Sequence, residues 1–544
     1  MNPTAPAPKT SKRPSLSNIA TLLMATTLVG QVLGILRTKL INANFPSTGH
    51  HSADAFFAAF SVPDFFFFTL AAGALGVAFI PVLTDRLYSG SRKSMWELSA
   101  SLMNFLALIM AGVGVIMFVF AQPLITHIVA PGLARDPQQL HTAVTIMRFL
   151  AFNPLLFTIS GILTSVQQTL GRFFFYAIAP LFYNLSIIVS AIVFSTSNHH
   201  QGGPGHLGLV GLGVGALIGC VLQLLVIIAG LVRTGFTWQP WIAWRNTGFR
   251  MVLRNLPPRS LDQGMDQIED IVETHLASGL GSGSITYFNN AYVLSTAPIL
   301  LVGTAISTAA FPRLNARLSQ NRPDLFRRDF LMILRAMIWI SAPLIVVCFF
   351  CRGYLARLIY TRGNLAIADI FGFLVVAIFF RILYAIMSRW FYAQKDTKTP
   401  LLVSIFTIAL NVVLAYTLSR PSNYGVEGLA LAQSIVAAVE VFVLAVIMLW
   451  RDHSLFDRHF WGGVWRILSV TGFSMVAGFI MISFYPLGIN DRGFITLGSK
   501  LAFISLVVFG VHLVVSALFD LEEAKPVFAR LKRLALKPIK FDAQ

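Results

Sequence analysis

Residues 208–232 read GLVGLGVGALIGCVLQLLVIIAGLV, a run without a single charged side chain. A helix that crosses the hydrocarbon core of a bilayer needs about 20 predominantly apolar residues, so this run is long enough to span a membrane. The whole chain of 544 residues is 56% hydrophobic and only 12% charged, whereas soluble proteins carry about 25% charged residues. The composition therefore excludes a soluble enzyme and indicates a polytopic membrane protein.

Similar apolar stretches recur along the whole chain. Together they predict about fourteen transmembrane helices, near residues 16–40, 54–84, 98–122, 139–168, 173–196, 208–232, 255–280, 284–312, 330–352, 366–392, 399–419, 425–450, 465–486 and 496–519. No remaining gap is long enough for a folded soluble domain. We therefore expect an all-α protein in which nearly every element crosses the membrane.

The positive charge follows the predicted topology. The formal net charge is +18, and the Lys and Arg residues concentrate in every second connection, which indicates a cytoplasmic side rather than binding to nucleic acid. This pattern places both termini in the cytoplasm, as basic tails over residues 1–15 and 520–544. The longest polar stretch, 233–254, interleaves tryptophan with arginine and is predicted to be a cytoplasmic linker at the membrane interface.

Two pairs of matching segments indicate an internal repeat. AFIPVLTDRL at 78–87 matches AAFPRLNARL at 309–318, and GLVGL at 208–212 matches GVEGL at 425–429. The spacing predicts two parallel six-helix bundles, over 16–232 and 255–450, followed by two further helices within 465–519. Parallel repeats that surround a central cavity are typical of transporters.

Other motifs have simple structural interpretations. The G-x-G pattern near Gly211 follows no strand, so helix packing is favoured over nucleotide binding. Cys348 and Cys351 lie in an apolar run and are expected to be buried thiols, and the histidines of the 196–207 connection are expected to be solvated. We predict no metal site, no cofactor and no enzymatic activity.

One predicted helix, 255–280, is unusually acidic. Its carboxylates fall within about 100° of arc at 100° per residue, at Asp262, Asp266, Glu269, Asp270 and Glu273. Charged side chains inside a membrane usually line water or serve a function. Two interpretations remain open: the stripe simply faces a water-filled cavity, or it binds a coupling cation (Na⁺ or H⁺) or a cationic part of a substrate.

Several segments resemble the MurJ (MviN) family of lipid II flippases, within the multidrug/oligosaccharidyl-lipid/polysaccharide exporter superfamily. They are VLGILR at 32–37, ADAFFAAF at 53–60 with Pro63, AAGA at 71–74, AFIP at 78–81, APG at 130–132, Ala179-Pro180 with Asn184, and FYAQKDTKTP at 391–400. The resemblance implies fourteen helices, an alternating-access cavity and a lipid groove formed by helices 13 and 14. It also implies a location in the bacterial plasma membrane and an undecaprenyl-pyrophosphate-linked peptidoglycan precursor as substrate.

The same resemblance suggests site residues. Arg37 and Asp54 match an arginine and an aspartate that the family needs, so Arg37 is expected to contact the pyrophosphate and Asp54 to act in gating or orientation. A second family arginine falls on Gln31, so Gln31 is also expected to bind the substrate. A helix 8 Asp-Arg pair of the family falls on Tyr292 and Val293. The expected partners are the lipid-linked precursor, membrane lipids and cell-wall synthesis proteins.

Two alternatives stay open at this point. A transporter of the same fold could export another polyprenyl-linked glycan or a cationic small molecule, which the acidic stripe would suit. A non-transporting scaffold of a cell-wall synthesis complex is the other alternative.

Overall fold

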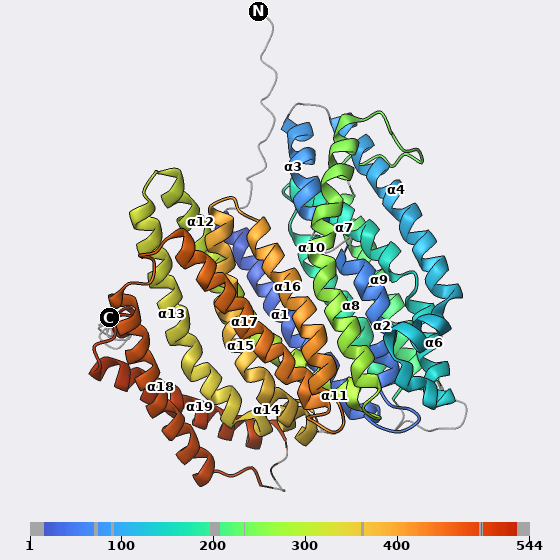
Figure 1. The fold of residues 1–544 in the computed structure, drawn as a ribbon. Helices are drawn as coiled ribbons and strands as arrows, with labels where there is room; N and C mark the ends of the chain where they lie inside the picture. The colour runs from blue at the N-terminus through green and yellow to red at the C-terminus, as the bar shows by residue number, and fades with distance from the viewer. Residues whose placement is uncertain are drawn as a thin grey trace, which may run out of the picture. The chain divides into compact units, whose positions relative to one another are not determined.

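A computed structural model describes residues 16–69, 74–88, 92–195, 207–232, 234–360, 364–488, 491 and 493–529. These residues form helices and connections without any strand, as expected. The α-helices are α1 (Leu16–Asn44), α2 (Asp54–Phe67), α3 (Ala74–Tyr88), α4 (Arg92–Val119), α5 (Ala121–Pro123), α6 (Pro137–Leu150), α7 (Asn153–Thr169), α8 (Phe174–Val193), α9 (Gly208–Leu231), α10 (Thr247–Ser278), α11 (Ser284–Pro298), α12 (Ala305–Ser319), α13 (Pro323–Phe350), α14 (Arg352–Ile359), α15 (Asn364–Ala393), α16 (Lys398–Leu418), α17 (Val426–Arg451), α18 (Arg458–Phe484) and α19 (Phe494–Leu518) (Figure 1). Two π-helical segments, η2 (Leu124–Val129) and η5 (Ile299–Thr304), and a 3₁₀ turn, η3 (Pro131–Arg135), complete the list.

Most of the predicted spans are confirmed. Within the described residues, 11 helical segments are long and apolar enough to cross a membrane, and each overlaps one of the predicted stretches. The other predicted stretches are occupied by α1, by α2 with α3, and by α10. A total of fourteen membrane crossings stays a prediction.

The chain divides into two compact units. The first comprises Met1–Leu40, Pro63–Val119 and Met147–Gln263, and the second comprises Ile41–Val62, Phe120–Ile146 and Gly264–Gln544. The predicted division into bundles 16–232 and 255–450 stays a prediction.

The core of the first unit gathers around α4. Phe79, Leu83, Met95, Trp96 and Phe249 are all buried in one apolar cluster, contributed by α3, α4 and the start of α10. Helix α7 packs against α4, and α8 packs along α9. The unit therefore encloses a continuous apolar interior although its outer helices expose many apolar side chains, as expected for a protein surrounded by lipid.

Residues 234–246 of the predicted interfacial linker pack along α4 in extended and turn conformations, whereas the last part of the predicted linker, from Thr247, forms the start of α10. Asn104 accepts a hydrogen bond from the indole N–H of Trp238 at 2.9 Å, and its own amide donates to the backbone oxygens of residues 239 and 241 at 2.6 and 3.1 Å. The indoles of Trp238, Trp241 and Trp244 are each more than half exposed. Exposed tryptophans beside arginines suit the headgroup region of a bilayer, so these residues have the side chains expected of a linker at the membrane interface.

The second unit is built around α15. This helix packs against α11, α13 and α17, and the C-terminal pair α18 and α19 packs beside α13 (Figure 1). Tyr354, Leu497 and Ile504 form a buried cluster that includes Cys351. Both Cys351 and Cys348 are buried free thiols, which confirms their expected structural role.

The repeated glycine motifs have the same local structure in both units. Gly208, at the start of α9, and Gly425, just before α17, have positive φ values of 47° and 58°, which favour glycine. A Cβ on Gly211 would lie 2.3 Å from an aromatic side chain just after α8, and a Cβ on Gly428 would lie 2.2 Å from a backbone oxygen at the end of α16. The glycines therefore serve close helix packing, which explains the G-x-G pattern.

Helix α2 connects the two units. Pro63 lies inside this helix, and the boundary between the units falls between Val62 and Pro63. Proline has no N–H group and cannot donate to the carbonyl four residues earlier. The helix therefore lacks one backbone hydrogen bond at the point where the chain passes from one unit to the other.

Candidate substrate and cation sites

Arg37 is held in place by two polar groups of the first unit. Its Nη1 donates to Oδ1 of Asn184 on α8 at 3.2 Å. Asp64, on α2, lies close enough for its charge to interact with that of Arg37. The structure thus brings Arg37 together with Asn184, from a distant motif, and with Asp64, which directly follows Pro63. A guanidinium oriented in this way keeps further N–H donors for an anionic ligand.

Gln31 does not join this group. It lies on the same helix as Arg37, but six residues earlier, which rotates it by about 120° around the helix axis. Its side chain is exposed, whereas that of Arg37 is partly buried. Its expected role in substrate binding stays a prediction.

Asp54 has an unexpected role as a cap for another helix. Its carboxylate accepts hydrogen bonds from the backbone N–H groups of Gly283 (2.6 Å) and Thr286 (2.8 Å), and from the Thr286 hydroxyl (2.6 Å). Gly283 is the N-cap of α11, so Asp54 satisfies N–H groups that the helix itself cannot satisfy. Its exposed fraction is 1%, and its expected role in gating or orientation stays a prediction.

Three connections of the second unit meet around this cap. The backbone N–H of Gly132 donates to the Ser278 hydroxyl at 3.1 Å, and Nδ1 of His50 lies 2.7 Å from Oδ2 of Asp136. Burial raises the pKa of Asp136, but hydrogen bonds from His50 and from two backbone N–H groups outweigh this effect and lower it overall. These contacts enclose a cavity of about 220 Å³, which Asp54 also lines.

Gly132 of the APG motif lies very close to the backbone of Ser278. A Cβ on Gly132 would lie only 1.7 Å from the backbone oxygen of Ser278. Only glycine allows the two backbones to approach this closely. Gly132 therefore allows the 130–132 connection to pack directly against the end of α10.

The acidic stripe of α10 is only partly described. The side chains of Asp262 and Asp266 lie outside the described part of the chain. Glu273 has an exposed fraction of 1%. Its two carboxylate oxygens accept hydrogen bonds from Nε2 of Gln433 at 2.7 and 2.9 Å.

Asn411 joins Glu273 to Glu269. Its Nδ2 donates to Oε1 of Glu269 at 2.6 Å and to Oε1 of Glu273 at 3.1 Å. Its Oδ1 is buried without a hydrogen-bond partner among the described residues. Helices α10, α16 and α17 thereby place two carboxylates and an amide oxygen together, a set of hard oxygen donors.

Sequence reasoning missed the polar residues that other helices add to this cluster. Asn411 and Gln433 are single polar residues within apolar helices, and only their burial beside carboxylates reveals them. A further cation, Arg381 on α15, lies within electrostatic range of Tyr292, as do Glu269 and Glu273. Arg381 therefore brings a positive charge to the position where the family resemblance places an Asp-Arg pair.

These observations define the class of protein. Two helical units with buried charged groups, in a chain with 11 apolar helical segments of spanning length among its described residues, are typical of polytopic membrane transporters. A family model described as "Lipid II flippase MurJ" matches residues 49–491. The chain belongs to this family, and it is a multi-pass protein of the bacterial inner membrane.

Individual relatives agree with the family model. A probable lipid II flippase MurJ of Buchnera aphidicola is 26% identical over 425 residues, covering 77% of this chain and 81% of its own length. A lipid II flippase MurJ of Burkholderia cenocepacia is 27% identical over 408 residues, covering 72% and 76%.

Solved structures show the same fold. A structure titled "Lipid II flippase MurJ, inward closed conformation" matches with a TM-score of 0.74 and 20% sequence identity, and the match covers 92% of this chain and 98% of that one. An inward-facing multidrug transporter of the MATE family matches with a TM-score of 0.65 and 16% identity, covering 80% and 98%.

Proposed function

We propose that the chain translocates lipid II, the lipid-linked peptidoglycan precursor, from the cytoplasmic to the outer leaflet by alternating access. The match of the family model to residues 49–491 carries this proposal, and the relatives named above support lipid II over other substrates. The transport needs no covalent chemistry. It needs a cationic site for the pyrophosphate and a conformational change that exposes this site to either side.

Arg37 is the proposed pyrophosphate contact. Its hydrogen bond to Asn184 and its interaction with Asp64 orient the guanidinium without using all of its donors. A phosphate group accepts paired hydrogen bonds from such a planar group. Release of the pyrophosphate then requires a change in the surroundings of Arg37, because separating an anion from a buried cation is energetically unfavourable.

Complementation of a MurJ-depleted bacterium tests this function. We expect the wild-type chain to restore growth and Arg37→Ala to fail while both reach the membrane in equal amounts. Arg148→Ala is the matched control, because Arg148 is also an arginine of the first unit, but it is exposed and stacks on Phe118. Growth with Arg37→Ala would favour a non-transporting scaffold. Failure of a well-expressed wild-type chain would favour another substrate.

We further propose that the Glu269–Glu273–Asn411 cluster couples transport to Na⁺ or H⁺. The support is the pair of carboxylates, buried at Glu273 and partly buried at Glu269, beside the unpartnered Oδ1 of Asn411. Buried carboxylates are stable when a cation or a proton neutralises them. Energy would then come from an ion gradient or the membrane potential, since one charge crossing 100 mV gains about 2.3 kcal/mol.

Neutral variants test the coupling. We expect Glu269→Gln and Glu273→Gln to abolish complementation at normal membrane levels, and the wild-type chain to show a dependence on the Na⁺ or pH gradient. Glu97→Gln is the matched control, because Glu97 is a glutamate of α4 in the first unit and lies outside the cluster. Full activity of both cluster variants would show that the stripe only lines water.

The remaining parts of the proposal concern topology and partners. Both termini are placed in the cytoplasm by the distribution of Lys and Arg. Helices α18 and α19 expose apolar side chains, including Phe479 and Leu506, as a groove for the polyprenyl tail requires. Cell-wall synthesis proteins are the proposed macromolecular partners. Labelling of cysteines introduced near either terminus, from inside and outside intact cells, tests the orientation.

A further inference from the structure

A larger cavity than the one beside Asp54 also lies in the second unit, away from the carboxylate cluster. It encloses about 790 Å³ and is lined by α13, the start of α14, α15 and α17. Its lining residues on α17 include Leu431, Ile435 and Ala438. These lie about 140–160° around the helix axis from Gln433, which contacts Glu273. The cavity is therefore on the opposite face of α17 and is a separate site.

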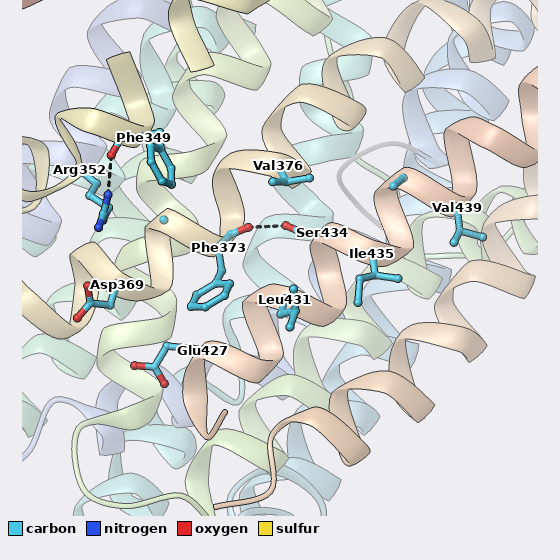
Figure 2. Close-up of a pocket in the computed structure, with 12 residues that line it drawn as sticks. Phe349, Arg352, Asp369, Phe373, Val376, Glu427, Leu431, Ser434, Ile435 and Val439 are labelled. Atoms are coloured by element: carbon cyan, nitrogen blue, oxygen red, sulfur yellow. Dashed lines mark hydrogen bonds between the residues drawn. The ribbon is translucent and has the colours of Figure 1, made fainter. Parts of the chain in front are cut away.

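The charged lining residues all come from helix ends. Arg352 begins α14, Asp369 lies in the second turn of α15, and Glu427 lies in the first turn of α17. Figure 2 shows Arg352, Asp369 and Glu427 on one side of the cavity, and Val376, Ile435 and Val439 toward the other. From Glu427 to Val439 the helix rises about 18 Å, which is close to half of the roughly 30 Å hydrocarbon core. The cavity is thus polar at one end and apolar over the depth of about one leaflet.

The charges of the polar end are available to a ligand. Arg352 donates to the backbone oxygen of Phe349 at 3.0 Å and lies over its ring, and this leaves other guanidinium N–H groups. Within the described residues, neither Asp369 nor Glu427 forms an ion pair or a side-chain hydrogen bond. Asp369 is exposed and Glu427 is partly buried. A guanidinium with N–H groups to spare and two carboxylates without an ion-pair partner among the described residues favour a ligand that carries both charges.

We propose that this cavity binds a phospholipid with an ethanolamine headgroup. The phosphate pairs with the Arg352 guanidinium, and the ammonium group lies between the carboxylates of Asp369 and Glu427. An acyl chain follows the apolar wall along Val376, Ile435 and Val439. An anionic phospholipid fits less well, because it would leave two carboxylates without a positive partner.

Native mass spectrometry of the purified full-length protein tests this proposal. The probes are 1-palmitoyl-2-oleoyl phosphatidylethanolamine and the matching phosphatidylglycerol, added at equal concentrations. We expect tighter binding of phosphatidylethanolamine. The double variant Asp369→Asn/Glu427→Gln should weaken this binding at least fivefold while phosphatidylglycerol binding does not fall.

Further variants separate the site from a general effect on folding. Ala438→Phe should place a larger side chain in the apolar part of the cavity and weaken binding of both lipids. Leu402→Phe, at an exposed apolar position of α16 outside the cavity, should change neither. Equal binding of the two lipids by the wild-type chain, or unchanged phosphatidylethanolamine binding in the double variant and in Ala438→Phe, would overturn the proposal. Because the assay measures lipid binding alone, its result is independent of lipid II transport.

Discussion

Removal of the Asp54 carboxylate should loosen the start of α11. In Asp54→Ala, the backbone N–H groups of Gly283 and Thr286 lose a charged and buried acceptor at 2.6 and 2.8 Å. A hydrogen bond to a charged group contributes about 1.5–3 kcal/mol, and a buried donor without a partner is unfavourable by a further 1–3 kcal/mol. Because the three contacts share one carboxylate, they are not additive, and we expect a loss of about 3–5 kcal/mol.

Hydrogen exchange measures this loss at the residues concerned. A decrease of about 3 kcal/mol in the free energy of local opening accelerates exchange by about 100-fold, so the amides of Gly283 and Thr286 should show at least this change. Asp54→Asn should be intermediate, because its amide keeps one acceptor oxygen. Asp324→Asn, in a fully exposed ion pair, should leave exchange unchanged. Unchanged protection at both amides in Asp54→Ala would refute the capping role.

Two further predictions concern other contacts of the second unit. Gly132→Ala should prevent growth in the complementation assay, because its Cβ would lie 1.7 Å from the Ser278 oxygen, whereas Gly112→Ala, with open space around the new Cβ, should grow normally. The pKa of Asp396, in the connection before α16, would be raised by burial, but hydrogen bonds from Thr399 in the first turn of α16 and the ion pair with Arg451 lower it to about 2. This group therefore stabilises the fold above its ordinary pKa of 3.8, and the stability is lost as the pH falls toward 2. The difference in melting temperature between wild type and Asp396→Asn should accordingly shrink as the pH is lowered from 6 to 3, and a constant difference would contradict this reasoning.

The membrane class and most of the helices could be predicted from sequence because they depend on long apolar runs. Such runs need no knowledge of neighbours, since the bilayer itself is the solvent. The matching glycine motifs were also informative, because a positive φ and a close backbone approach restrict the residue type locally. Gly208 and Gly425 show the positive φ, and Gly428 shows the close backbone approach. The fold is thus encoded by features that are short-range or purely compositional.

The site could be predicted only in part. Arg37 was identified by its family motif, but its partner Asn184 comes from another helix, and no periodicity links the two. Asp54 was identified as important, but its role as a cap depends on the position of α11. Asn411 and Gln433 carry no sequence signal, because an isolated amide in an apolar helix has many structural roles. Three-dimensional proximity alone distinguishes these residues.

The proline in α2 has a consequence for how the protein moves. Bending an ordinary helix stretches or breaks backbone hydrogen bonds inside the membrane, where no water replaces them. At Pro63 the bond to the carbonyl of Ala59 is absent from the start, so a change in the angle between the two halves of α2 leaves the number of backbone hydrogen bonds unchanged. Helix α2, which passes from one unit to the other at this residue, can therefore serve as a hinge at low enthalpic cost.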